Sequence, residues 1–97
     1  MVHHYVAFKF KEGSSISELY SFLKKEYQEL SMIVSGVGTI KVHRNSVPRE
    51  YNMDVLIEIT FEDTTALNHY LSHKSHKSIK ERLDPYVINR FSFDYEI

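Results

Sequence analysis

The segment from Ser15 to about Val34 repeats its apolar side chains at the spacing of an α-helix. Ser14 or Ser15 can cap this helix, with Glu18 three residues after Ser15 as in a capping box, and Gly36 suits the left-handed residue that ends many helices. The apolar stripe consists of Ile16, Leu19, Tyr20, Leu23, Tyr27, Leu30 and Val34. A helix that is apolar on one side only must bury that side against another layer of structure. The rest of the chain therefore has to form that layer.

Four further segments alternate apolar and polar residues, as β-strands do. They span residues 2–11, 39–46, 52–61 and 88–97. A second helical region begins at Asp63 or Thr64, is interrupted near His73 and stops at Asp84-Pro85. The resulting order, β-α-β-β-α-β, predicts an α+β ferredoxin-like protomer with a four-stranded antiparallel sheet and its helices on one face.

The alternation also predicts which face of each strand is buried. The residues expected beneath the helices include His4, Val6, Phe8 and Phe10, the odd-numbered residues from Met53 to Phe61, and Phe91, Phe93, Tyr95 and Ile97. The opposite face is mixed, with Tyr5, Ala7, Lys9, Leu56, Thr60 and Ile88 among Asp54, Glu58 and Arg90. Such a mixture favours a two-fold homodimer through the sheet face, and the alternative is a monomer with scattered surface apolar groups.

Composition excludes several classes of function. The 97 residues form one domain, residues 1–97, because two cores of this size would be too small to fold alone. The 12 Lys and Arg nearly balance the 13 Asp and Glu, so nucleic acid and anionic membranes are not expected partners. The absence of cysteine excludes thiol catalysis. No apolar run approaches the ~20 residues of a membrane span and no secretory signal is visible, so we expect a cytoplasmic protein.

Three residues are candidates for chemistry. Tyr70 and His76 flank the interruption of the second helical region and both should face the core, where a hydroxyl and an imidazole can form an acid/base pair. The alternative is that Tyr70 only packs and His76 only bonds a helix-end carbonyl. His4 should also point inward, either as a hydrogen-bonded core histidine or beside a cavity. His73 and His76 have a spacing that can chelate a metal, but without further ligands we predict no metal site.

Three sequence motifs resemble those of the stress-responsive A/B barrel (Dabb) family. The opening segment, residues 4–11, is similar to the family's first strand. The segment Tyr70-Leu71-Ser72-His73-Lys74-Ser75-His76 resembles its Tyr-x-x-His-Pro-x-His motif, and Phe93-Asp94-Tyr95-Glu96-Ile97 its closing Asp-Tyr strand. The resemblance implies that two protomers appose their sheets as a dimeric α+β barrel with the helices outside.

The resemblance also implies a site between the sheet and the helices. One branch of the family is a plant polyketide cyclase that performs an aldol condensation without a cofactor. Its acid/base histidine and tyrosine match His76 and Tyr70, and two more pocket residues match His4 and Tyr27. The family's proline is Lys74 here, and a further pocket histidine of the cyclase corresponds to Val55. The candidate ligand-binding residues are His4, Tyr27, Val55, Tyr70, His76, Phe91 and Phe93.

Two functions follow as hypotheses. The first is a homodimeric stress-response barrel that, without turnover, binds a small apolar or aromatic molecule or serves stability. The second is a cofactor-free enzyme that acts on a polyketide-like or β-keto substrate, with His76 as general base and Tyr70 orienting it or holding an enolate oxygen. A small monooxygenase of related fold ranks below both.

Overall fold

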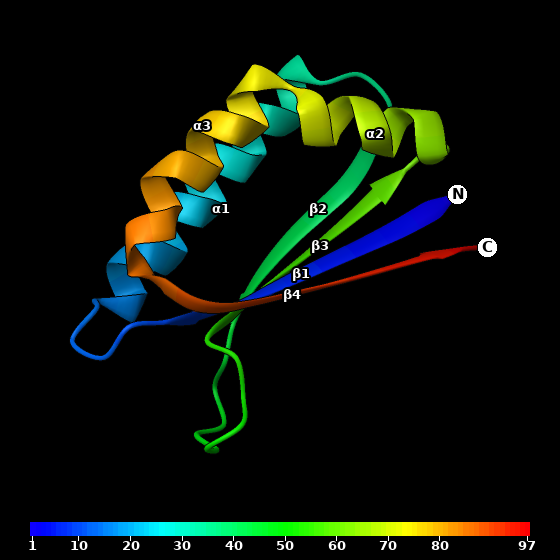
Figure 1. Cartoon of the computed structure of the whole chain (residues 1–97). Coiled ribbons are helices and arrows are strands. Elements are labelled where there is room, and N and C mark those ends of the chain that lie inside the picture. The colour runs from blue at the N-terminus through cyan, green and yellow to red at the C-terminus, as the bar shows by residue number, and fades with distance from the viewer.

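The computed structural model describes all residues from Met1 to Ile97, and its strands and helices follow the predicted order (Figure 1). The elements are β1 (Val2–Phe10), α1 (Ile16–Ile33), β2 (Val37–Arg44), β3 (Val55–Phe61), α2 (Thr64–Ser72), α3 (Lys74–Leu83), the 3₁₀ turn η1 (Asp84–Tyr86) and β4 (Val87–Glu96). The strands form one antiparallel sheet in the order β2-β3-β1-β4. The predicted ferredoxin-like α+β architecture is confirmed, with the second helical region divided into α2 and α3.

Hydrogen-bonding side chains cap the N-termini of α1 and α2. Ser15 Oγ accepts a hydrogen bond from the Glu18 backbone N–H at 3.3 Å, as the capping-box pattern predicted. Asp63 does the same for Ala66 at 2.8 Å. Gly36 has a φ of +82°, and a Cβ there would lie 2.6 Å from the Ala66 Cβ, so this turn requires glycine both for its conformation and for space.

All three helices cover one face of the sheet and leave the other face open (Figure 1). The buried residues between the layers form one core, in which Leu23, Tyr27 and Leu30 of α1 meet the inward rows of β1 and β3. The inward rows are Val2, His4, Val6, Phe8 and Phe10 on β1, and Val55, Ile57, Ile59 and Phe61 on β3. This arrangement agrees with the alternation in both strands.

The chain changes direction between α2 and α3 at His73. This residue has an extended backbone (φ −69°, ψ 138°). It is both the C-cap of α2 and the N-cap of α3. Its Nδ1 accepts a hydrogen bond from the Ser75 backbone N–H at 3.1 Å, which caps α3. The turn therefore places Tyr70, in the last turn of α2, against His76, in the first turn of α3, with ring centroids 4.6 Å apart.

Strand β4 faces the opposite way from the prediction. Phe91 and Phe93 stand opposite Ala7 and Tyr5 on the open face of the sheet, and they are 63% and 66% exposed. Arg90, predicted on the open face, stands opposite Phe8 and points to the helix side. The prediction that Phe91, Phe93, Tyr95 and Ile97 lie beneath the helices is therefore wrong.

The helix side of β4 is polar because this strand forms one edge of the sheet. Its residues on that side are Arg90, Ser92, Asp94 and Glu96. An edge strand lies at the border of the helical layer, so its helix-facing row contacts solvent and a cavity rather than the centre of the core. The register shift between Lys9 and Phe10 leaves Ile88 without a partner on β1.

Candidate functional site

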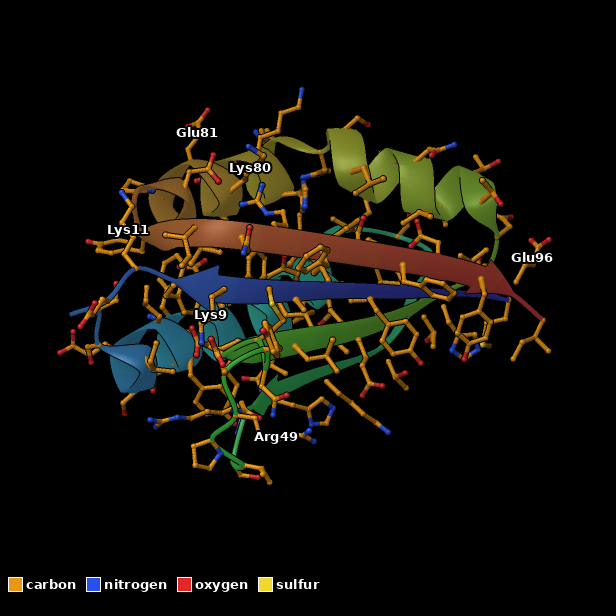
Figure 2. The ribbon with its side chains drawn as sticks, turned by 60° about the horizontal axis from the view of Figure 1, so that its bottom comes forward. Lys9, Lys11, Arg49, Lys80, Glu81 and Glu96 are labelled. Carbon is orange, nitrogen blue, oxygen red and sulfur yellow. The ribbon has the colours of Figure 1, made fainter.

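A cavity of about 240 Å³ lies between α3 and the edge strand β4. Its walls come from four elements: β1, α1, the α2–α3 region and β4. The lining residues are His4, Val6, Phe8, Tyr27, Leu71, His76, Ile79, Lys80, Leu83, Arg90, Ser92 and Asp94. Figure 2 shows Lys80 on the helix that runs along β4, at the border of this space. Half of the lining residues are hydrophobic, and the polar groups come from β1, α1, α3 and β4.

His4 and Asp94 form a hydrogen-bonded pair in the cavity wall. They are direct partners in the antiparallel pairing of β1 with β4, and His4 Nδ1 donates to the Asp94 carboxylate. The imidazole is 7% exposed and the carboxylate 44%, so the pair connects the buried interior with the outer surface. The bond fixes the ring orientation and leaves Nε2 as the second functional atom of His4.

His76 is half-buried and its Nδ1 is a buried atom without a hydrogen-bond partner in the protein. Burial lowers its pKa below the ordinary value of 6.5, and a hydrogen bond with the backbone of Leu71 at the end of α2 opposes this shift in part. The nearby positive charges of Arg90 and Lys80 act in the same direction as burial. The imidazole is therefore neutral at pH 7. A neutral imidazole in a cavity wall can accept a proton from a bound molecule.

Two buried tyrosines are connected through their hydroxyl groups. Tyr70 donates to the Tyr27 hydroxyl oxygen at 3.2 Å, and burial raises the pKa of both residues. Both hydroxyls thus stay protonated at neutral pH. Because Tyr27 accepts this bond, its own hydrogen is free, and Tyr27, unlike Tyr70, lines the cavity. The Tyr70 ring packs between His4 and His76, with centroid distances of 5.9 and 4.6 Å.

The cavity therefore brings together three of the seven predicted ligand-binding residues, His4, Tyr27 and His76. Tyr70 lies directly behind them. Val55 is 1% exposed and belongs to the core without lining the cavity. Phe91 and Phe93 lie on the other face of the sheet, so their assignment to the pocket is wrong.

Sequence reasoning did not single out Arg90, Ser92 and Asp94 as site residues. The available signal was the polar row of β4, which alternates with an aromatic row on the same strand. The antiparallel register of β4 on β1 would have placed Asp94 beside His4. If the aromatic row of β4 is placed on the open face of the sheet, all three polar residues fall on the cavity side together.

No three His, Cys, Asp or Glu side chains are grouped so that they could hold a metal ion. None of the helices combines the length and the apolar character needed to cross a membrane.

The fold and the cavity define a two-layer α+β protein with a small pocket between its layers. The model of the stress responsive A/B barrel domain, Dabb, matches residues 2–97. The chain therefore belongs to this family, and the resemblance found in the sequence motifs is confirmed. None of the curated proteins matches the chain.

Solved structures show the same fold. A dimeric protein of unknown function and ferredoxin-like fold from Bacteroides fragilis is 21% identical, with a TM-score of 0.88 over 99% of this chain and 95% of that one. A Dabb family protein from Mesorhizobium loti is 26% identical, with a TM-score of 0.79 over 99% and 95%. A hydroxynitrile lyase from Passiflora edulis is 17% identical, with a TM-score of 0.83 over 99% and 92%. This fold thus occurs both in proteins of unknown function and in an enzyme.

Proposed function

We propose that this protein is a homodimer in which each protomer binds one small apolar or aromatic molecule in the cavity between α3 and β4. The dimer is supported by the open sheet face, where Phe91 and Phe93 are exposed beside Tyr5 and Tyr95. Large aromatic side chains that share one exposed face are typical of protein interfaces. The similar protein from Bacteroides fragilis is described as dimeric.

The observation that carries the proposed binding function is the cavity itself. Its apolar wall includes Val6, Phe8, Ile79 and Leu83. Its polar side chains are His4, Tyr27, His76, Lys80 and the three residues of β4. Ligand sites have this combination of apolar walls and a small number of placed polar groups. The volume of about 240 Å³ is below the about 300–1,000 Å³ of drug-sized pockets, which favours a single-ring molecule.

The binding proposal is tested by thermal unfolding with 4-ethylphenol, ethyl benzoylacetate and decanoate as probes. A compound that binds only the folded state raises the melting temperature. We expect a rise for at least one probe, lost in His76→Ala and kept in His69→Ala, whose histidine is exposed outside the cavity. Equal melting temperatures with and without every probe would contradict the proposal.

A second candidate function is proton transfer without a cofactor, as in the polyketide-cyclase-like alternative. The specific observation that favours it is that His76, a neutral imidazole, lines the same cavity as Tyr27, whose hydroxyl hydrogen is free. His76 would take a proton from the carbon next to a carbonyl group. The electron pair of that C–H bond would form a carbon–carbon double bond while the π pair of the carbonyl moves to its oxygen, and Tyr27 would donate a hydrogen bond to the resulting enolate oxygen.

In this scheme Tyr70 is a positioning residue, because its hydroxyl fixes Tyr27 and its ring packs on His76. The enolate can then attack a second carbonyl, which is the carbon–carbon bond-forming step of an aldol condensation. The lyase from Passiflora edulis supports the idea that this fold can perform catalysis. The small cavity favours single-ring ketones over extended polyketides.

The catalytic candidate is tested by exchange of the methyl protons of acetophenone in D₂O, followed by NMR. A general base contributes about 10²–10⁴-fold, so the wild type should exceed buffer by a clear margin. His76→Ala should remove this acceleration and Tyr27→Phe should weaken it, whereas His69→Ala should retain it. Exchange at the buffer rate would contradict the catalytic candidate, and accelerated exchange that persists in His76→Ala would contradict the role of His76 as general base.

A further inference from the structure

One end of the cavity carries two cations and shares a single counter-ion between them. Lys80 Nζ donates to one carboxylate oxygen of Asp84 at 2.9 Å, and Arg90 Nη2 donates to the other at 2.7 Å. Lys80 and Arg90 line the cavity, whereas Asp84 in η1 does not. The hydrogen bonds from Lys80 and Arg90 lower the pKa of Asp84, so it remains ionised at neutral pH. Two positive charges thus meet one negative charge at this end.

Arg90 is held in place with most of its donors free. Its guanidinium group lies 5.3 Å from the centroid of the Phe8 ring, and its bond to Asp84 uses one of five N–H donors. No other side-chain hydrogen bond of Arg90 occurs in the protein. A planar guanidinium that is already oriented recognises a carboxylate better than a free surface side chain, because less conformational entropy is lost on binding.

The cavity's own carboxylate is at the opposite end of the β4 row. Asp94 lies four residues beyond Arg90 on the same face, which corresponds to about 13 Å along a strand. The Asp94 carboxylate accepts a hydrogen bond from His4 Nδ1. Ser92 stands between the two ends and makes no side-chain hydrogen bond within the protein, so its hydroxyl is also available to a ligand. The cavity is therefore polar at both ends, apolar between them, and cationic at the Arg90 end.

We propose that the ligand of this cavity carries a carboxylate or a similar delocalised anionic group, and that Arg90 determines this specificity, with Lys80 and Ser92 beside it. The proposal rests on the proposed binding function and adds the chemical class of the ligand. The apolar part of the ligand contacts Val6, Ile79 and Leu83. Its anionic group binds Arg90 at the rim, so the opposite end of the ligand faces His4.

Paired probes of equal shape test this inference. Benzoate and benzamide, and likewise 3-phenylpropanoate and 3-phenylpropanamide, differ in charge but hardly in size. Their dissociation constants are measured by NMR titration of the methyl signals of Val6, Ile79 and Leu83, which report occupation of the cavity. We expect each carboxylate to bind at least tenfold more tightly than its amide.

Two variants and a matched control locate the preference. Arg90→Gln should reduce the preference for carboxylate to less than threefold while the amide affinity stays within twofold, and Lys80→Gln should reduce it partly. Arg82→Gln should keep the full preference, because Arg82 pairs with Glu26 on the outer surface and does not line the cavity. Lys80→Gln alters an exposed helix position, so it remains informative if Arg90→Gln fails to fold.

The outcomes separate the two proposals. Carboxylate and amide binding with equal affinity, or a preference that survives both Arg90→Gln and Lys80→Gln, would overturn the role of Arg90 and leave the binding function intact. Methyl signals of the cavity that respond to neither member of any pair would overturn both. A preference of tenfold or more that depends on Arg90 supports the inference.

Discussion

His4 and Asp94 occupy directly opposed positions on β1 and β4, and the imidazole Nδ1–H donates to the carboxylate at the edge of the cavity. The histidine is otherwise surrounded by aromatic side chains, with the Tyr70 and Phe61 ring centroids 5.9 and 6.2 Å away. An imidazole can be buried in such surroundings only if its donor is satisfied. Asp94 thus stabilises the inward orientation of a polar residue in the core.

Removal of the carboxylate should therefore leave a buried donor without a partner. We expect Asp94→Leu to lower the free energy of unfolding by about 1–3 kcal/mol, measured by urea denaturation. His4→Phe in the same background should recover much of this loss, because the unpaired group is then absent. A double-mutant cycle with a coupling energy near zero would show that the pair contributes nothing to stability.

Phe8 provides a test of the core. It is 4% exposed on the helix side of β1, and its ring stacks on Phe10 at a centroid distance of 6.1 Å. Phe8→Ala should lower the free energy of unfolding by about 3–5 kcal/mol, because the loss of buried area adds to the cavity left behind. An unchanged urea midpoint would mean that Phe8 does not pack between the layers.

The order of the helices and strands could be predicted because the spacing of apolar residues differs between helices and strands, and because capping residues mark where helices begin. Ser15 and Asp63 mark helix starts by local chemistry that tertiary packing does not alter. Gly36, expected as the left-handed C-cap of the first helix, lies two residues beyond the observed C-cap, which is Val34 in an extended conformation. His4 and His76 were correctly expected to face inward, because each shares its face with apolar neighbours whose burial the structure confirms. Local pattern was sufficient for these residues.

The face of β4 could not be predicted in the same way. Alternation shows that Phe91 and Phe93 share a face, but it does not show which layer that face contacts. We assumed that the aromatic row lies beneath the helices, as it does on β1. On this edge strand the aromatic row lies on the open face instead, and the polar row serves the cavity. The positions of Arg90 and Asp94 beside the cavity depend on the register of β4 against β1. The apolar pattern of a single strand carries no information about that register.

The exposed aromatic row leads to a prediction about assembly. Phe93→Asp would place a charge at the centre of the proposed interface, where burial of an unpaired carboxylate is costly. We expect the wild type to have a dimer mass by light scattering at micromolar concentration and the variant to have a monomer mass. Met32→Asp is the control, since Met32 is 81% exposed on α1, away from the sheet. A wild-type monomer, or a dimer that tolerates Phe93→Asp, would rule out association through this face.

The buried imidazole of His76 predicts how stability depends on pH. Its pKa lies below 6.5 in the folded protein, so between that value and the ordinary value the unfolded chain binds more protons. Stability should therefore fall as the pH decreases through this window, with no further contribution from His76 once both states are protonated. His76→Gln should show a smaller loss of unfolding free energy between pH 7.5 and pH 5 than the wild type, whereas the exposed control His69→Gln should match the wild type. Urea denaturation at the two pH values measures this difference, and equal losses in all three proteins would show that His76 is as easily protonated in the folded state as in the unfolded chain.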